Sequence, residues 1–256
     1  MSGADAFARL LASGVPVREP VAVVVAHADD ETLWAGAALG RMTECRLIHL
    51  TDSSPRDGGD ARRLGFATRE DYAAARAAEL DAALVELGAT AARLGYGVAD
   101  QEAVEHLDGL IERLTVDCAG VAAIVTHPYE GGHPDHDAAA LAARVVADRL
   151  GVPVVEFACY RLHAGERVWA RFEPDPAYPE HSRPLLPDER ARIDRALAAH
   201  RSQAGVFGDW RPEVERWRAA PRYDFTRPPP GRECLYDGFG WALTSARWRE
   251  RAASWA

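Results

Sequence analysis

The chain has 256 residues, of which 48% are hydrophobic and 27% charged, so it fits a globular protein and excludes disordered, collagen-like and coiled-coil chains. Its 30 basic and 39 acidic residues give a formal net charge of −9, so a nucleic-acid partner is not expected. The sequence contains no lysine, which excludes a lysine nucleophile, a lysine Schiff base and a P-loop lysine.

Strand-like and helix-like segments alternate along the first two thirds of the chain. In chain order the sequence predicts a strand at 21–26, a helix at 31–42, a strand at 46–51, a helix at 69–87, a short strand near 92–96, a helix at 101–114, a strand at 121–126, a helix at 136–150 and a strand at 152–158. The first strand is an unbroken apolar run, which is typical of a buried parallel strand. The alternation predicts an α/β fold with a mostly parallel sheet and helices on both faces.

The pattern changes beyond about residue 161, where prolines become dense and only one further helix, at 188–200, is predicted. We interpret this region as loops that wrap the same domain. The expected organisation is a single domain over 1–256, with a core of about 20–205 and a loop-rich, Pro/Trp-rich C-terminal extension of about 206–256. Its tryptophans are more typical of core or interface positions than of sugar platforms, and an interface between copies would make the protein a homo-oligomer.

The sequence gives no sign of a membrane span or of a secretory signal. The apolar run at 21–26 is far shorter than the roughly 20 residues that cross a bilayer. The first five residues lack the basic stretch that opens a signal peptide. The cysteines lie far apart and form no CxxC pair, which excludes a zinc ribbon or a redox motif. We expect a cytoplasmic protein with no membrane partner and with reduced cysteines.

Two predicted strands end in clusters of histidine and aspartate. The first strand runs into Ala26-His27-Ala28-Asp29-Asp30-Glu31, and the strand at 121–126 runs into a segment that contains His133-Pro134-Asp135-His136. Because ligand sites in open α/β sheets lie outside the carboxyl ends of the strands, we expect the two clusters to meet. His27, His136 and one carboxylate would form a catalytic metal site, since a structural zinc would be closed by a fourth protein ligand.

The residues alone leave the carboxylate ligand open. In an extended strand Asp29 would lie on the same side as His27, whereas in a helical turn Asp30 would be its neighbour. Each cluster also has a structural reading. Asp29 to Glu31 can cap a helix and complement its dipole. His127, which precedes a proline, is better explained as a structural residue.

The two clusters resemble the paired signatures of the LmbE-like, or PIG-L, deacetylase family. The first is similar to the family's AHPDDE signature, and His133-Pro134-Asp135-His136 is similar to its second signature, in the expected order and spacing. Supporting matches are Arg76-Ala-Ala-Glu79-Leu80, an aspartate at Asp100 and the pair Ser202-Gln203. The resemblance covers about residues 20–205.

This resemblance implies a Rossmann-like α/β fold and a zinc-dependent enzyme that hydrolyses an N-acetyl group, often on a glucosamine unit. It implies one Zn²⁺ per chain with His27, Asp30 and His136 as ligands. Asp29 resembles the general base, and His133 resembles the group that stabilises the tetrahedral intermediate. Arg76 and Asp100 resemble substrate-binding residues. The expected partner is a small N-acetylated molecule, in particular a sugar conjugate.

Two positions depart from the family pattern. Ala28 stands where the family usually has proline, which loosens the turn but removes no ligand. Gly131 stands where some members have tyrosine, so Tyr129 is a candidate to replace it. Asp52, after the second strand, is a further candidate for the pocket, and the Gly-rich loop at 53–60 is either a lid or a solvated loop.

Two other readings compete with the deacetylase. His27-x-Asp29 with a distant histidine is the ligand pattern of a non-haem iron oxygenase, although such sites usually occupy β-jelly-roll scaffolds and this chain alternates strands and helices. An inactive metal-binding protein is the second alternative. Asp29 and His133 count against it, because metal binding alone requires neither residue.

Overall fold

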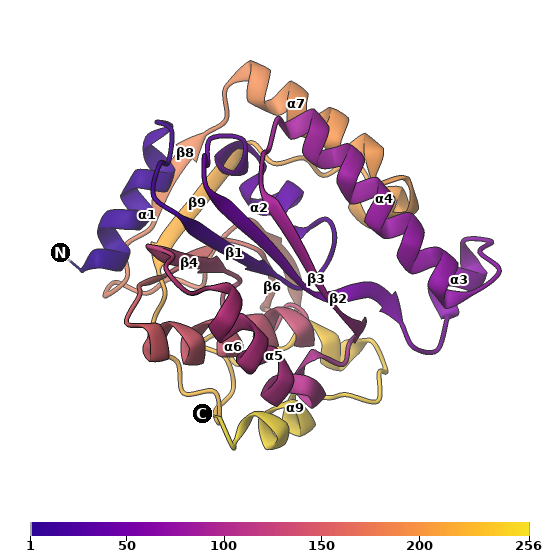
Figure 1. Cartoon of the computed structure of the whole chain (residues 1–256). Helices are drawn as coiled ribbons and strands as arrows, with labels where there is room; N and C mark the ends of the chain where they lie inside the picture. The colour runs from indigo at the N-terminus through magenta and orange to yellow at the C-terminus, as the bar shows by residue number, and fades with distance from the viewer. Residues whose placement is uncertain (1, 256) are drawn as a thin grey trace.

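A seven-stranded sheet lies at the centre of the computed structural model, which describes residues 2–255 (Figure 1). Its strand order is β3-β2-β1-β4-β5-β9-β8; the strands from β3 to β5 are parallel, whereas β9 is antiparallel to both neighbours. The predicted α/β class with a mostly parallel sheet is confirmed. The strands span β1 Val21–Val25, β2 Cys45–Pro55, β3 Ala92–Asp100, β4 Ala123–Thr126, β5 Val154–Phe157, β8 His181–Pro184 and β9 Val214–Ala219.

Helices cover both faces of the sheet, as predicted (Figure 1). One face packs against α1, α2, α4 and α7, and the other packs against α5, α6 and α9. A two-stranded hairpin, β6 with β7, stands apart from the main sheet. These elements span α1 Gly3–Ser13, α2 Asp30–Leu39, α3 Gly59–Arg63, α4 Arg69–Leu87, α5 Leu107–Asp117, α6 Pro134–Leu150, β6 Tyr160–His163, β7 Glu166–Trp169, α7 Pro187–Ala199, α8 Ala204–Phe207 and α9 Ser245–Ala252, with 3₁₀ turns at Ala103–His106, Arg201–Gln203 and Leu235–Gly238.

The central position of β1 explains its unbroken apolar sequence. Val21, Val23 and Val25 face the core beneath α2 and α4, whereas Ala22 and Val24 face the core beneath α5 and α6. Since both faces of a parallel strand are covered by helices, no position along it favours a polar side chain. The strand ends at Val25, one residue before the apolar run ends at Ala26, so His27 lies just beyond the edge of the sheet.

The sequence predicted the long helix α4 with its correct bounds, Arg69–Leu87. Thr68 and Asp71 form a capping box at its start, and Gly88 ends it in the left-handed conformation at φ 68°. Helix α6 begins at Pro134, two residues earlier than predicted. A proline at the first helical position is favourable, because the amide hydrogen it lacks would have no partner inside the helix.

The antiparallel strands β6, β7, β8 and β9 were not predicted. In β9 the buried side chains do not form a simple apolar pattern. The charged residues Glu215 and Arg218 are buried, as is the apolar Trp217 between them. The carboxylate of Glu215 accepts hydrogen bonds from the amides of Ala37 and Ala38, at 2.7 and 3.1 Å. A sequence pattern that counts charged residues as exposed therefore misses this strand.

The C-terminal region packs against the first turn of α6. Trp248 of α9 is fully buried and donates a hydrogen bond from Nε1 to the carbonyl oxygen of Pro134, at 2.9 Å. Gly131, at φ 69°, lies so close to the backbone of Glu233 that a Cβ would approach its carbonyl oxygen to 2.7 Å. Among residues 2–255, no helix combines the length and the apolar character needed to cross a membrane.

Candidate active site

All seven residues that the sequence assigns to the site line one cavity of about 220 Å³. The cavity opens at the carboxyl ends of β1, β3 and β4, which is the edge where an open α/β sheet places its ligands. β1 leads to His27, Asp29 and Asp30, and β4 leads to the start of α6 with His133 and His136. The remaining two, Arg76 and Asp100, come from α4 and from the end of β3.

Potential ligand atoms of three residues, here called the ligand triangle, lie close together, and the two histidines approach different oxygens of Asp30. His27 Nδ1 is 3.3 Å from His136 Nε2 and 3.4 Å from Asp30 Oδ2, and His136 Nε2 is 3.2 Å from Asp30 Oδ1. Ligand atoms around a tetrahedral zinc, with bonds of about 2.0–2.1 Å, are separated by about 3.3–3.4 Å. The donor set and its spacing therefore fit zinc with one position left for water or substrate.

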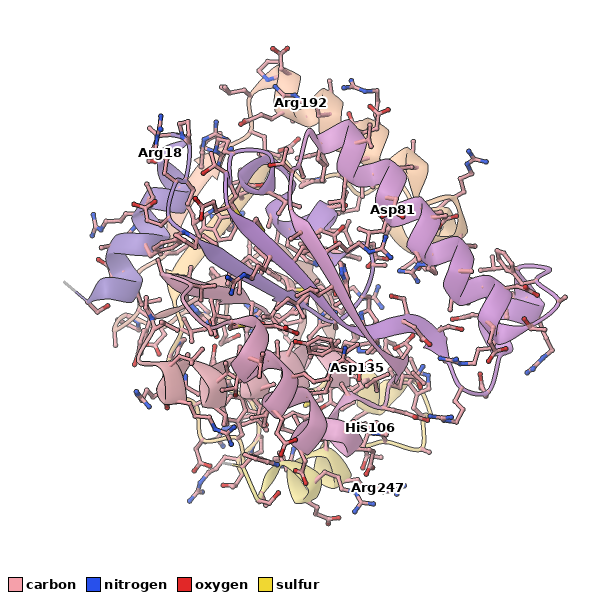
Figure 2. The ribbon with its side chains drawn as sticks, in the orientation of Figure 1. Arg18, Asp81, His106, Asp135, Arg192 and Arg247 are labelled. Carbon is pink, nitrogen blue, oxygen red and sulfur yellow. The ribbon has the colours of Figure 1, made fainter. Side chains whose placement is uncertain are left out.

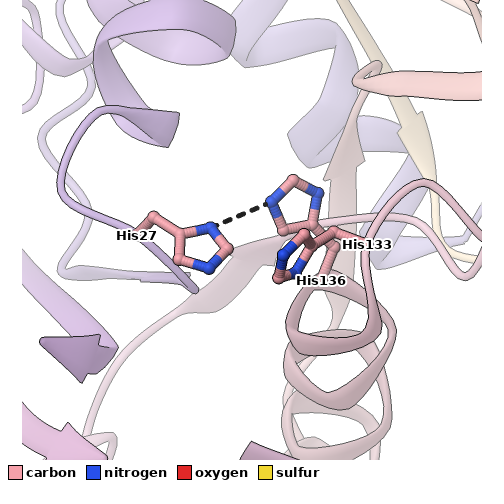
Figure 3. Close-up of side chains that lie close together, drawn as sticks. All are labelled: His27, His133 and His136. Atoms are coloured by element: carbon pink, nitrogen blue, oxygen red, sulfur yellow. Dashed lines mark hydrogen bonds between the residues drawn. The ribbon is translucent and has the colours of Figure 1, made fainter. Parts of the chain in front are cut away.

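The three histidines approach one another from two separate segments. Figure 3 shows His27 extending from the loop after β1 toward His133 and His136, which belong to the start of α6. The ring centroids of His27 and His133 are 4.5 Å apart, and those of His27 and His136 are 5.3 Å apart. One nitrogen from each of the three rings falls within a group of atoms 4.8 Å or less apart.

The turn after β1 sends the two adjacent aspartates in different directions. Asp30 is the first residue of α2, and its Oδ2 accepts a hydrogen bond from the amide of His27, at 2.7 Å. Asp29 instead pairs with Arg76, with Oδ2 2.9 Å from a guanidinium nitrogen. Its side chain makes no capping hydrogen bond to α2, so helix capping does not explain it.

The surroundings of these two carboxylates also differ in charge. Burial acts to raise the pKa of Asp30, but His136 and His127 outweigh it and hold that pKa well below its usual value. Burial raises the pKa of Asp29, and Arg76 opposes this rise only in part. Asp30 is therefore the more firmly ionised of the two, as a metal ligand should be, and Asp29 is the more basic.

Two further carboxylates hold the outer edge of the His27 ring. Nε2 of His27 is 3.0 Å from Asp100 Oδ1 and 3.3 Å from Asp135 Oδ2. Asp135 is fully buried, and the amides of Gln101 and Ala103 donate hydrogen bonds to it. In Figure 2 it lies in the interior, whereas labelled residues such as Arg18 and Arg192 extend from the surface. Hydrogen bonds of this kind fix the tautomer and orientation of a metal-binding histidine.

His133 occupies the position before the first turn of α6. Its Nδ1 accepts a hydrogen bond from the amide of Asp135, at 3.2 Å, so its Nε2 is the nitrogen that carries the proton. Nε2 lies 3.6 Å from Asp100 Oδ1 and lines the cavity. Burial lowers the pKa of His133 well below its usual value, and the neighbouring His27 lowers it further. This arrangement makes His133 a neutral donor toward the cavity.

Arg76 is buried and points into the site. Besides Asp29 it contacts the carbonyl oxygen of Ser53, at 3.3 Å, and the hydroxyl of Tyr72, at 3.4 Å. An ordinary surface ion pair with a neighbour on α4 therefore does not describe it. The Tyr72 hydroxyl also accepts a hydrogen bond from the side-chain amide of Gln203, at 2.8 Å, so the Ser-Gln pair noted in the sequence lies beside the cavity.

His127 supports the ligands and does not line the cavity. It is fully buried, and its ring stacks on that of His136 with centroids 3.9 Å apart. Burial, together with His136, lowers the pKa of His127 to about 3, so the ring is neutral. On the same side, Cys159 Sγ lies 3.5 Å from His136 Nδ1. The reading of His127 as a structural residue stays a prediction, because His127, His136 and Cys159 also form a group whose atoms lie close enough together to hold a metal ion.

The two departures from the family pattern have structural explanations. The amide of Ala28 donates a hydrogen bond to Ser53 Oγ, at 2.8 Å, which a proline could not do because it has no amide hydrogen. Gly131 has no room for a side chain, as its position against Glu233 requires. Tyr129 does not replace a tyrosine there: it is buried, donates to the carbonyl oxygen of Arg227 at 2.7 Å and lines no part of the cavity.

Asp52 also lies outside the cavity. Its carboxylate forms an ion pair with Arg69 at the start of α4, and it lines a separate hollow beside β2. Of the loop at 53–60, Asp60 alone reaches the cavity wall. The sequence analysis did not identify Asp135 as part of the site, although it lies inside the second motif. It also did not identify the aromatic residues beyond residue 158 that line the cavity.

Solved structures share this fold. The A40926 pseudoaglycone deacetylase Dbv21 is 18% identical, with a TM-score of 0.60 over 81% of this chain and 99% of its own. The zinc inhibited form of teicoplanin deacetylase Orf2 is 16% identical, with a TM-score of 0.62 over 80% of this chain and 99% of its own. The N,N'-diacetylchitobiose deacetylase of Pyrococcus horikoshii is 17% identical, with a TM-score of 0.51 over 75% of this chain and 74% of its own.

A search among curated proteins gave no match. Residues 22–147, however, match the family model described as PIG-L, GlcNAc-PI de-N-acetylase. That segment contains both His/Asp clusters, Arg76 and Asp100, and it therefore contains every residue that the sequence assigned to the site. On this match, residues 22–147 belong to the PIG-L family.

Proposed function

We propose that this protein is a zinc-dependent N-deacetylase that releases acetate from an acetylated amino sugar or a related small molecule. The observation that carries the proposal is the approach of His27 Nδ1, His136 Nε2 and the carboxylate of Asp30 to within 3.2–3.4 Å of one another, each histidine nearest a different Asp30 oxygen, which is close to the spacing of ligands around zinc. The family description, a de-N-acetylase, and the deacetylase names of the structural relatives support the same reaction.

His27, Asp30 and His136 would hold one Zn²⁺ per chain. When bound, the metal supplies Lewis acidity, which lowers the pKa of a bound water toward about 7 and polarises an amide carbonyl. The outer edge of the His27 ring is held by Asp100 and Asp135, which keeps Nδ1 turned toward the ligand triangle.

Asp29 is the residue best suited to move the proton. It adjoins the ligand Asp30, its own carboxylate is held by Arg76, and burial raises its pKa. In amide hydrolysis it would take a proton from the attacking water and pass it to the departing nitrogen as the C–N bond breaks. Water and amide then leave as acetate and a free amine, and Asp29 returns to its starting state.

His133 is the residue best suited to bind the developing oxyanion. Its Nε2 faces the cavity and carries the proton, because Nδ1 accepts from the backbone. A preorganised donor of this kind contributes about 3 kcal/mol to transition-state stabilisation. Arg76 and Asp100 also line the cavity and remain candidates for contact with substrate hydroxyls, although each already has a partner within the site.

The iron oxygenase is the less suitable reading. Its ligand pattern needs Asp29, but it is Asp30 whose oxygens approach both histidines. An inactive metal-binding protein would need neither Asp29 nor His133 beside the ligands.

Acetate release from a panel of N-acetylated sugars, with and without a chelator, tests the proposal. We expect one acetate per free amine, loss of activity with chelator and recovery with Zn²⁺. Turnover that consumes oxygen and needs Fe²⁺ would replace the proposal with the oxygenase. If the zinc-loaded protein hydrolyses no N-acetyl compound, the inactive metal-binding protein becomes the favoured hypothesis.

A further inference from the structure

The two ligand histidines are held at their outer nitrogens by different chemical groups. His27 turns Nδ1 to the ligand triangle, and the carboxylates of Asp100 and Asp135 hold its Nε2. His136 turns Nε2 to the triangle, the contact drawn as a dashed line in Figure 3, and its Nδ1 lies 3.5 Å from the sulfur of Cys159. The second histidine thus has a thiol where the first has carboxylates.

Cys159 lies in the short connection between β5 and β6, outside the segment that matches the family model. It is 2% exposed and does not line the cavity. Within residues 2–255, its sulfur is the only hydrogen-bond partner of His136 Nδ1. A residue in this place has no access to substrate, so any effect that it has on the site must act through His136.

The direction of this hydrogen bond follows from the ligand role proposed for His136. A neutral imidazole carries one proton, and the nitrogen that binds a metal uses its lone pair. With Nε2 as the ligand, the proton is on Nδ1 and is donated to the sulfur, which is a weak acceptor. A partner at the outer nitrogen fixes both the tautomer and the orientation of a metal-binding histidine.

The orientation of the His136 ring needs such a partner. The ring stacks on that of His127 with centroids 3.9 Å apart and 16° between the planes, which fixes its plane. A half-turn about the bond from Cβ to the ring would preserve this plane but would put carbon atoms where both nitrogens now lie. The sulfur of Cys159 distinguishes the two orientations, because it forms a hydrogen bond with Nδ1 and none with a ring carbon.

The same atoms do not make a good second metal site. One atom from each of His127, His136 and Cys159 falls within a group 4.8 Å or less across. The lone pair of an imidazole nitrogen lies in the plane of its ring, so an ion bound to His136 lies in that plane. The nearly parallel ring of His127 cannot direct its own lone pair at the same ion. The thiol is therefore better explained as a partner of His136 than as a metal ligand.

We propose that Cys159 is a positioning residue for the metal site: its sulfur accepts a hydrogen bond from His136 Nδ1 and holds His136 with Nε2 turned to the ligand triangle. This inference rests on the proposed function, since it assumes that the triangle binds zinc. It assigns a role to a buried cysteine that takes no part in the reaction itself.

The test is the zinc affinity of variants at this position, measured by competition with a chromogenic chelator. Cys159→Ala removes the acceptor and should raise the Kd for zinc by about 10-fold, the lower end of the usual effect of an outer partner. Cys159→Ser retains an acceptor and should lose less. The matched control is Cys118→Ala: Cys118 is another fully buried cysteine, distant in sequence and outside the cavity, and its loss should leave the Kd unchanged.

Two spectroscopic measurements on the wild-type chain need no variant. In the zinc-loaded protein, ¹⁵N NMR of the histidine rings should place the proton of His136 on Nδ1. In the cobalt-loaded protein, the near-ultraviolet spectrum should lack the intense charge-transfer band of a thiolate bound to Co²⁺. One metal ion per chain should be present in both cases.

The outcomes separate this inference from the proposed function. If the wild-type chain binds no zinc, the proposed function fails and the inference fails with it. If the chain binds zinc but Cys159→Ala and Cys118→Ala have the same Kd as the wild type, the proposed function stands and the role of Cys159 is wrong. A thiolate–cobalt band that disappears in Cys159→Ser would make Cys159 a metal ligand and would also overturn the inference.

Discussion

At the scale of single residues, the clearest feature is the divergence of two neighbouring aspartates. Asp29 and Asp30 have the same chemistry and are adjacent in the chain. The turn between β1 and α2 directs Asp30 to the two histidines and Asp29 to Arg76. Substitution of Asp29 by asparagine should therefore have a different consequence from substitution of Asp30.

Asp30→Asn should weaken zinc binding, because a neutral amide is a poorer ligand than a carboxylate. Asp29→Asn should keep the zinc and still lose about 100- to 10,000-fold in kcat, the usual contribution of a general acid–base residue. Zinc content and kcat measured on both variants give a two-by-two result. The opposite pattern would make Asp29 the ligand, and full retention of zinc and rate in both variants would argue against the deacetylase.

His133 should matter for turnover and not for metal binding. His133→Ala removes a hydrogen-bond donor from the cavity and should lower kcat by about 100-fold or more while zinc content stays at one per chain. His133→Gln can still donate from its side-chain amide, so it should retain more activity than the alanine variant if a neutral donor is sufficient. Loss of zinc in either variant would assign His133 to the metal site instead.

At the scale of elements, the buried ion network around β9 connects that strand to the parallel part of the sheet. Arg218 lies 2.9 Å from Glu130 and 3.0 Å from Glu156, and all three side chains are buried. Tyr223 donates a further hydrogen bond to Glu156, at 2.9 Å. Burial raises the pKa of Glu156 to about 7 although Arg218 lowers it, so the carboxylate depends on the guanidinium to remain ionised.

Arg218→Met should destabilise the protein by about 3–5 kcal/mol at pH 8, because it leaves two buried carboxylates without their cation. In the variant the folded-state pKa of Glu156 lies still further above its unfolded value than in the wild type, where it is about 7. The extra cost of ionising Glu156 therefore arises above about pH 7, and the loss relative to wild type should shrink as the pH falls from 8 toward 7.

Denaturant unfolding at several pH values measures this loss. Arg222→Met is the matched control, since Arg222 forms an exposed ion pair with Asp148 and its removal should have little effect. An equal effect of the two substitutions would show that burial of the network does not matter for the stability of β9.

At the scale of the whole molecule, the site concentrates negative charge in the interior. Four carboxylates, those of Asp29, Asp30, Asp100 and Asp135, are buried or nearly so within one cluster. Arg76 contacts the cluster as a cation, and Asp100, Asp135 and Asp30 outweigh burial and hold the pKa of His27 well above its usual value. A divalent cation at the ligand triangle would offset part of this repulsion. Metal binding should therefore contribute to the stability of the fold as well as to activity.

Removal of metal by a chelator should lower Tm and abolish acetate release, and re-addition of Zn²⁺ should restore both. At a free zinc concentration 100 times Kd, the stabilisation expected from binding is about 2.7 kcal/mol. Differential scanning calorimetry with and without chelator measures it, and His136→Ala is the matched control that should not respond to Zn²⁺. A Tm that is independent of metal in the wild-type chain would contradict a ligand site in the core.

Much of the fold could be predicted because it depends on local sequence. The parallel strands β1 and β4 are largely apolar runs with little ambiguity, β5 is apolar apart from Glu156, and α4 is capped by residues directly next to it in the sequence. β8 and β9 could not be predicted, since buried charges such as Arg218 are stable only with partners from distant segments. The metal-ligand candidates were also visible, because each follows a strand whose end is fixed by its apolar pattern.

The sequence by itself determined which strands end in histidine and aspartate and, through the family resemblance, which reaction to expect. Only the tertiary structure decided how those side chains are divided: Asp30 toward the histidines, Asp29 toward Arg76, and Asp135 behind His27. It also decided that aromatic residues from distant loops line the same cavity. The reason is physical: periodicity and motif spacing encode the path of each segment, whereas contacts between segments depend on how the sheet and its helices pack.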